Sequence, residues 1–280
     1  MSNHGILAEA NAEAAAVLGS EFVDIRLRRA VIGVYFTGVA LNCETAGAAS
    51  TPSRGELHVT CCPTGEETVL APGTLAGRRA VDVLDELYSP HPLKRVVAIA
   101  TLNALAEACW QRRPDPRVDL SEGDAFKAAA IAPGEHVVLV GAFVPFLKAL
   151  KRMRQPYTVV ELNPSMLKPE ELPHYRPATE AAAAIPEGDV VLLTGITLFS
   201  DSLELLLGYA RPGARIVVVG PTVGMLPGPF LDRGVDLLGG VRVTRPDAFL
   251  DALAEAAAPQ HFLGRTAERV VLKRRAAKVG

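Results

Sequence analysis

The chain has 280 residues, of which 49% are hydrophobic and 21% charged, and its formal net charge is -2. This length predicts about two domains, and the apolar content is sufficient for a packed core, which excludes a disordered chain. The balanced charge excludes the strong positive field that holds a nucleic acid, and aromatic residues, at 5%, are too few for base-stacking platforms. We therefore expect a globular protein that has no nucleic-acid partner.

The apolar stretches are too short to cross a membrane. The best of them, residues 137–147, is about half the ~20 residues that a spanning helix needs, and the N-terminus lacks the pattern of a signal peptide. The four cysteines, Cys43, Cys61, Cys62 and Cys109, do not make a disulfide framework in a chain of this length. These features predict a cytoplasmic protein without a membrane partner.

Residues 1–115 are predicted to form a small α+β domain. Helical periodicity covers residues 6–18, and alternating or apolar patterns predict strands over 22–29 and 31–41. The segment 45–55, rich in small residues and proline, is predicted to be a loop, and a short strand follows. That strand covers 56–61, and helices are expected over 75–87 and 93–112.

A domain boundary is predicted at residues 112–116, because two prolines and a charge cluster cannot continue a helix. Beyond it, short apolar runs recur at 137–140, 158–161, 190–194 and 216–220, with a weaker one at 235–238. Most are separated by helix-compatible segments, namely 144–153, 179–184 and 201–209, with 246–257 after the last. This alternation is typical of a parallel sheet covered on both faces. Residues 116–280 are therefore predicted to form a Rossmann-like α/β domain.

In open parallel sheets, ligands bind beyond the carboxyl ends of the strands. That rule selects the turns that begin at Gly141, Glu161, Thr194 and Gly220. The first is a partial dinucleotide motif, because Phe143 is too bulky for close approach of a pyrophosphate. Glu161 follows 20 residues after Gly141, where an acid holds a ribose diol in nucleotide-binding sheets, although a solvent-facing acid is the alternative.

Small polar side chains and glycines gather in the same turns. Asp201, with Glu204 three residues later, has the spacing of a helix capping box, which would explain the aspartate without a ligand. The same helix start would also receive an anion. With Gly141, Phe143 and Glu161, the candidate binding residues are Asn163, Thr194, Gly195, Thr197, Ser200, Asp201, Gly220 and Thr222.

The Thr-Gly-Ile-Thr stretch at 194–197 and the Gly-Pro-Thr stretch at 220–222 resemble the DUF364 family, which has the provisional name of a heavy-metal chelation domain. The first half resembles its companion DUF4213, a module similar to the N-terminal domain of enolase. The resemblance implies one site in a cleft between the two domains, and it supplies no reaction. One departure is Ser200-Asp201-Ser202, where the family pattern has an amide-bearing triplet. Further matching stretches are 33–49, 141–146, 160–164, 189–198, 203–206 and 234–240.

Two groups of residues are candidates for metal or catalytic chemistry. His58, Cys61 and Cys62 supply an imidazole and two thiols of the kind that bind Zn, Cu(I) or Ni. Their spacing is not diagnostic, because neighbours on a strand point to opposite faces. Cys43 and Glu44 are candidates for a catalytic nucleophile or base, and packing beneath a loop is the alternative for the cysteine.

We expect the cleft to bind a small polar or anionic ligand, a metal ion or a metal chelate, with a role in metal homeostasis. The sequence identifies no cofactor, and a divalent or heavy-metal ion is the candidate. The alternative is a transferase- or lyase-like enzyme that acts on a small nucleotide-, adenosyl- or pterin-like molecule in the same cleft. Assembly as a homodimer is compatible with either function.

Overall fold

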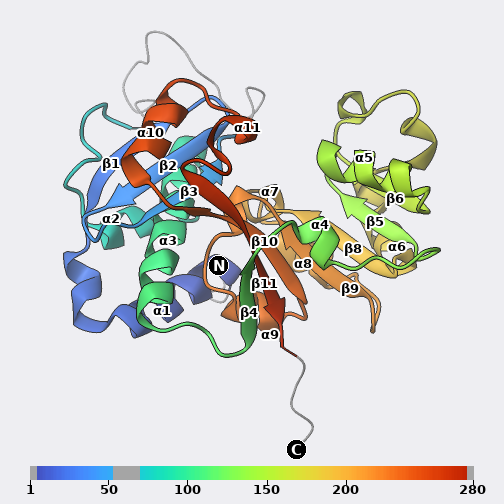
Figure 1. The fold of residues 1–280 in the computed structure, drawn as a ribbon, viewed down its shortest axis with the longest axis horizontal. Helices are drawn as coiled ribbons and strands as arrows, with labels where there is room; N and C mark the ends of the chain where they lie inside the picture. The colour runs from blue at the N-terminus through green and yellow to red at the C-terminus, as the bar shows by residue number, and fades with distance from the viewer. Residues whose placement is uncertain (1–4, 53–69, 276–280) are drawn as a thin grey trace, which may run out of the picture. The chain divides into compact units, whose positions relative to one another are not determined.

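The computed structural model describes residues 5–52 and 70–275, which form two compact units (Figure 1). The first comprises Met1–Pro116, Gly220–Pro229 and Gly240–Val270, and the second comprises Arg117–Val219, Phe230–Gly239 and Val271–Gly280. This division differs from the continuous second domain expected over 116–280, since two later segments belong to the first unit. Each unit has a sheet and a core of its own.

The first unit is built around a three-stranded antiparallel sheet in the order β1-β2-β3. Its strands are β1 (Leu27–Ile32), β2 (Phe36–Leu41) and β3 (Ala46–Ser50). Its helices are α1 (Ile6–Leu18), α2 (Ala80–Leu84), α3 (Pro92–Arg112), α10 (Pro246–Ala254) and α11 (Pro259–Phe262), with 3₁₀ turns η1 (Gly19–Asp24) and η7 (Pro221–Val223).

Helices cover both faces of this small sheet. A Cβ atom at Gly47 of β3 would lie 2.3 Å from the backbone nitrogen of Ala104, so β3 packs directly on the backbone of α3. A Cβ at Gly38 of β2 would lie 2.6 Å from Leu250 of α10, on the opposite face. All residues of β2 are buried as a result.

The structure corrects several expectations for the first half. Residues 22–29 begin with η1 instead of a strand, and 31–41 is interrupted by a turn in which the amide of Gly33 donates to the carbonyl of Phe36. The expected loop over 45–55 contains β3, whose small residues fit its close contact with α3. Of the helix expected over 75–87, only Ala80–Leu84 is α-helical, whereas the helices over 6–18 and 93–112 are confirmed. The strand expected over 56–61 lies outside the described residues.

The second unit contains most of a large, mostly parallel sheet. Its strands are β4 (Val118–Glu122), β5 (Val137–Val140), β6 (Tyr157–Glu161), β7 (Tyr175–Pro177), β8 (Val190–Thr194) and β9 (Arg215–Val219). Its helices are α4 (Ala125–Ala128), α5 (Val144–Met153), α6 (Ala181–Ala184), α7 (Ile196–Phe199) and α8 (Leu203–Leu207). Helix α9 (Gly228–Asp232) and strands β10 (Leu237–Val243) and β11 (Ala267–Arg274) contribute residues to both units.

The order of the large sheet is β4-β11-β10-β9-β8-β5-β6-β7. The neighbours from β7 to β10 pair in parallel. Numbered along the chain from β5, these six strands follow the order 3-2-1-4-5-6 of doubly wound sheets. The predicted parallel sheet is thus confirmed, and the direction of winding reverses between β5 and β8.

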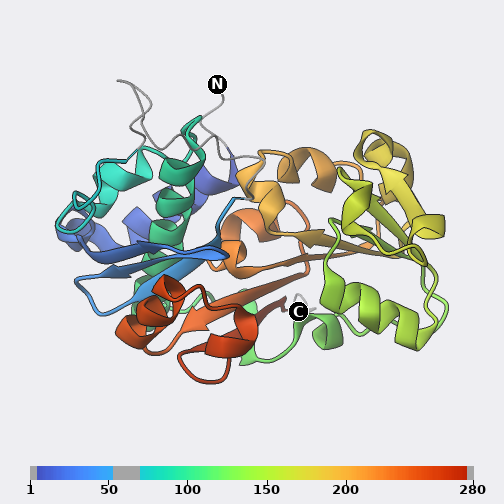
Figure 2. The same ribbon diagram turned by 90° about the horizontal axis from the view of Figure 1, so that it is seen from above.

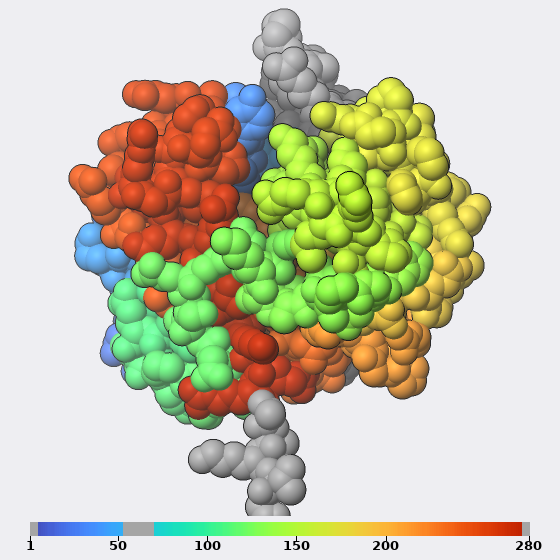
Figure 3. Space-filling view, turned by 45° about the vertical axis from the view of Figure 1, so that its right-hand side comes forward, coloured from blue at the N-terminus to red at the C-terminus, as the bar shows by residue number. Residues whose placement is uncertain are grey.

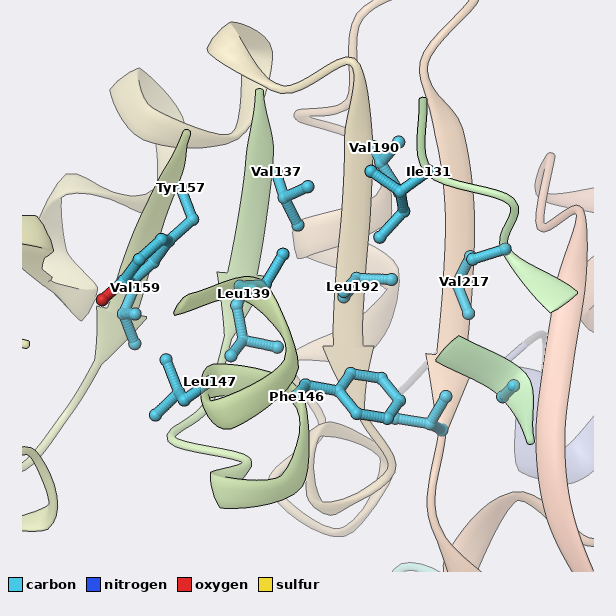
Figure 4. Close-up of a cluster of buried hydrophobic side chains, with 14 of the residues drawn as sticks. Ile131, Val137, Leu139, Phe146, Leu147, Tyr157, Val159, Val190, Leu192 and Val217 are labelled. Carbon is cyan, nitrogen blue, oxygen red and sulfur yellow. The ribbon is translucent and has the colours of Figure 1, made fainter. Parts of the chain in front are cut away.

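Buried aliphatic side chains of the parallel strands form the core of the second unit (Figure 4). Leu139, Val159 and Leu192 lie beneath α5, which contributes Phe146 and Leu147. In Figure 2, the lime-green α5 lies on one side of this sheet and the gold-orange helices that follow β8 lie on the other. Among the described helices, none combines the length and the apolar character that crossing a membrane would require.

Candidate functional site at the carboxyl edge of the parallel sheet

Three of the four predicted turns lie side by side at the switch point of the parallel sheet. Val140 of β5 pairs with Val160 of β6 on one side and with Leu193 of β8 on the other. The turns that begin at Gly141 and Glu161, and the end of β8 at Thr194, therefore meet at one edge. This is the edge at which doubly wound sheets bind their ligands.

Gly141 and Thr194 contact each other closely across this edge. The φ angle of Gly141 is +93°, in the region that favours glycine. A Cβ atom at this position would lie 2.5 Å from Oγ1 of Thr194. Glycine is therefore required here for two reasons, the backbone conformation and the adjacent hydroxyl group.

The Thr194 hydroxyl is buried and has no hydrogen-bond partner among the described residues. The carbonyl of the same residue is satisfied, since it accepts a 2.7 Å hydrogen bond from the hydroxyl of Thr197. Buried polar atoms are nearly always paired in folded proteins, so an unpaired one requires an explanation. A hydroxyl can both donate and accept, which suits it to a ligand atom of either kind.

Glu161 stabilises the turns through backbone contacts. One carboxylate oxygen accepts a 2.7 Å hydrogen bond from the amide of Ala142, and the other accepts from the amides of Leu162 and Asn163 at 2.8 and 3.0 Å. The side chain thus ties the turn after β5 to the turn after β6. These three contacts explain the acid at the end of β6 without a ribose-like ligand.

The remaining polar residues of the second unit have local hydrogen bonds. The side-chain oxygen of Asn163 accepts from the amide of Ser165, and Thr197 is buried against β8. The expected capping box at Asp201 is wrong: α8 begins at Leu203 with Ser202 as its N-cap, and Asp201 has a φ of +55° in the turn before it. The Ser200 and Ser202 hydroxyls lie 2.9 Å apart.

The Gly-Pro-Thr turn belongs to the first unit. The Thr222 hydroxyl is buried and accepts a 3.2 Å hydrogen bond from the amide of Ser50. The side-chain amide of Asn103, on α3, donates to the carbonyls of Ala48, Pro221 and Thr222. Gly220 precedes this turn with a φ of +136°. Sequence reasoning missed Asn103, because a single asparagine on an apolar helix carries no motif.

The candidate catalytic residues lie in the hairpin turn between β2 and β3. Cys43 is exposed, and its sulfur lies 3.3 Å from the hydroxyl of Thr45. The Glu44 side chain is 78% exposed and 3.9 Å from the Arg28 guanidinium. The described contacts are thus a hydroxyl group for Cys43 and a guanidinium group for Glu44, and neither contact identifies a reaction.

Metal ligation finds no support in the residues that the structure describes. In residues 5–52 and 70–275, no group of three or more His, Cys, Asp or Glu side chains could hold a metal ion. The remaining described cysteine, Cys109, is buried, and burial raises the pKa of its thiol to about 12. His58, Cys61 and Cys62 lie outside the described residues.

The sequence and the fold match known proteins. Residues 124–272 match the DUF364 family model and residues 15–106 match the DUF4213 model, both described as "Putative heavy-metal chelation". An uncharacterized protein of Methanocaldococcus jannaschii is 29% identical over 180 residues, which cover 61% of this chain and 63% of that protein.

Two solved structures of DUF364 proteins of unknown function share the fold. One, from Pyrococcus horikoshii, has a TM-score of 0.73 and 19% identity, with 96% of this chain and 100% of the other covered. The other, from Desulfitobacterium hafniense, has a TM-score of 0.72 and 17% identity, with 95% and 99% covered. At these identities the likeness concerns the fold alone.

Proposed function

Since this chain belongs to the DUF364 family, we propose that it binds a small organic molecule at the carboxyl edge of its parallel sheet. The site consists of the turns that follow β5, β6 and β8. Metal enters this function as a chelate, that is, as an ion already held by the organic molecule. The family description concerns heavy-metal chelation. Binding of a metal that is already chelated agrees with this description and with the side chains at the edge, which are neutral or hydrogen-bonded to the backbone.

The unpaired hydroxyl of Thr194 is the observation that carries the proposal. It lies beside Gly141 at the point where the winding of the sheet reverses, where ligands of such sheets bind. A buried hydroxyl without a partner costs about 1–3 kcal/mol. A ligand that hydrogen-bonds to Thr194 would recover this cost, and it would be recognised through the same atom.

A bare metal ion does not fit these turns. The one acidic side chain in residues 141–144, 161–166 and 194–197, Glu161, uses both carboxylate oxygens to accept backbone hydrogen bonds. Thr194 and Thr197 offer neutral hydroxyl groups, which are weak ligands for the soft ions of a heavy-metal function. The direct metal site considered at His58, Cys61 and Cys62 is a separate proposal.

The experiment compares the protein with its Thr194→Val variant. Each is dialysed against a metabolite extract, and the retained molecules are identified by mass spectrometry, with metal content measured in parallel. We expect the wild type to enrich one or more organic molecules and the variant to lose about 90% of this enrichment, as the loss of ~1.4 kcal/mol implies.

The stability of the variant separates binding from folding. Valine replaces a buried, unpaired hydroxyl by a methyl group of similar shape, so the ligand-free free energy of unfolding should not fall. Thr179→Val, at an exposed threonine, is the matched control. Equal enrichment by wild type and Thr194→Val would contradict the proposal.

A further inference from the structure

Helix α5 turns a basic face to solvent. Its other side is buried in the core of the second unit, through Phe146, Leu147 and Leu150. Lys148, Lys151 and Arg152 lie on the side away from this core, because residues three and four positions apart share one face of a helix. Figure 3 shows α5 in lime green at the surface, beside the yellow segment that follows β6.

The segment that follows β6 extends this face. The ammonium group of Lys151 donates to Glu170 at 3.3 Å and to Glu171 at 2.5 Å. Glu171 also accepts a 2.9 Å hydrogen bond from the amide of Lys168. These contacts place the exposed Lys168 close to the C-terminal end of α5, where Arg154 is also exposed. The basic face is therefore defined here as Lys148, Lys151, Arg152, Arg154 and Lys168.

Local contacts neutralise only part of this charge. Residues 144–154 and 167–174 contain five lysine and arginine residues against two glutamates, an excess of three positive charges in a chain whose formal net charge is -2. The helix dipole favours cations in the last turn, but Lys148 lies before that turn. Among the residues that the structure describes, the side chains of Lys148, Arg152 and Arg154 have no hydrogen bond or ion pair. Their charges are therefore available to an anionic partner.

We propose that the basic face binds the surface of an anionic phospholipid membrane. Clusters of about four to eight lysine and arginine residues on an amphipathic helix are typical of such binding, which needs no spanning segment. Exposed apolar side chains accompany the cations: Val144 lies one turn before Lys148 on the same face, and Met153 lies between Arg152 and Arg154. Their exposed fractions are 45% and 44%. A lipid interface accommodates apolar side chains beside cations, whereas the phosphate backbone of a nucleic acid offers them no apolar contact.

Sedimentation with vesicles tests the proposal on the full-length protein. Vesicles of about 70% phosphatidylcholine and 30% phosphatidylglycerol are compared with vesicles of phosphatidylcholine alone, both at low ionic strength. We expect the partition coefficient to be at least ~10-fold higher for the anionic vesicles. Raising the salt concentration to about 0.5 M should abolish most of this difference, because exposed charges are then screened within a few ångströms. Equal partition to the two kinds of vesicle would overturn the proposal.

A triple variant tests the place of the contact. Lys148→Gln, Arg152→Gln and Arg154→Gln together remove three exposed cations that have no partner among the described residues, so the melting temperature should stay within a few degrees of the wild type. We expect the partition coefficient for anionic vesicles to fall at least ~10-fold. Unchanged binding by this variant would contradict the assignment to α5.

The matched control removes the same charge outside the basic face. It replaces three exposed cations by glutamine, namely Arg265, Arg269 and Lys273. We expect its partition coefficient to stay within ~2-fold of the wild-type value. An equal loss in both triple variants would show that net charge alone governs the binding and would overturn the proposal. Tighter binding to a short RNA duplex than to the anionic vesicles, lost in the α5 variant, would overturn it in favour of a nucleic acid.

Discussion

Glu161 shows how one side chain can hold two turns of the candidate site together. Its two carboxylate oxygens accept hydrogen bonds from the amides of Ala142, Leu162 and Asn163. These contacts fix the turns after β5 and β6 relative to each other. From the sequence, an acid at this position predicts recognition of a ribose-like diol. The hydrogen bonds from neighbouring amides could not be predicted, because they depend on the conformation of two turns.

Glu161→Gln should therefore lower the stability of the protein. A glutamine has one oxygen, so its amide nitrogen would face at least one backbone N–H group that now donates to a carboxylate. We expect a loss of about 1–2 kcal/mol in the free energy of unfolding, measured by urea denaturation. Glu180→Gln, at an exposed acid, should change stability by less than about 0.5 kcal/mol. Unchanged stability of Glu161→Gln, with loss of ligand binding alone, would contradict the structural role.

At the scale of the element, strand β3 depends on a glycine. The backbone of α3 approaches so closely that a Cβ at Gly47 would lie 2.3 Å from the nitrogen of Ala104 and 2.4 Å from the carbonyl oxygen of Ala100. Backbone atoms of a long helix cannot move aside without disturbing the helix itself. The strand and the helix therefore require each other.

Gly47→Ala should destabilise the protein by about 3 kcal/mol, the upper part of the usual range for overpacking. Gly240→Ala on β10 is the matched control in the same unit, since its Cβ would approach no heavy atom closer than 3.5 Å. Thermal unfolding of both variants checks the prediction. Similar melting temperatures for the two variants would show that β3 can move away from α3.

The elements that the sequence predicts best are those with an unambiguous local pattern. Strands β5 and β8 are continuous aliphatic runs, and α5 starts with a proline in its first turn, so their bounds agree with the prediction. Strand β3 has the sequence Ala-Gly-Ala-Ala-Ser, which by itself indicates a loop. These small residues form a strand because they allow its close contact with α3. Strands β4 and β11 were missed because charged and exposed residues interrupt or flank their short apolar segments.

A buried acid anchors the segment between β6 and β7 to α5. The Glu171 side chain is only 5% exposed, and it accepts a 2.5 Å hydrogen bond from the ammonium group of Lys151. Burial alone would raise the pKa of Glu171, but the bonds from Lys151 and from the amide of Lys168 outweigh it and lower the pKa.

The lowered pKa of Glu171 predicts a loss of stability in acid. Its ionised form contributes fully above the unfolded value of about 4.3, and the contribution is lost as the pH falls further through the folded pKa. Lys151→Met should cost about 2 kcal/mol at pH 7, because a buried carboxylate loses its cation. Denaturation curves from pH 7 to 3 test this, with the exposed Arg152→Met as the control. Equal curves for both variants would contradict the role of the pair.

At the scale of the whole molecule, the first unit is discontinuous in sequence. Its core joins Phe36 and Ala40 of β2 to Phe249 and Leu250 of α10 and to Phe262. From the sequence, the prolines at 114 and 116 predict a boundary, and the first segment of the first unit ends at Pro116. The sequence cannot indicate that a helix 130 residues later completes the small sheet, because amphipathic helices do not specify which sheet they cover.

A fragment of residues 1–116 should therefore not fold by itself. It lacks α10 and α11, which cover the apolar face of β2, and it lacks Asp247 and Asp251, which pair with Arg28 and Arg29 at 2.7 Å. We expect no cooperative thermal transition by circular dichroism. The same fragment joined by flexible linkers to residues 220–229 and 240–270 should recover one. A cooperative transition of the shorter fragment would contradict this account.

Because the core of the first unit is discontinuous in sequence, its parts are translated at different times on the ribosome. Between Pro116 and Gly240 the chain grows by 124 residues, which takes about 6–25 s at the usual rates of translation. Throughout that interval the face of β2 that carries Phe36 and Ala40 lacks its partners from α10 and α11, while the strands from β5 to β9 are being translated. The nascent protein thus completes its N-terminal unit only after most of the second unit has been translated, and an apolar strand remains uncovered until α10 has been translated.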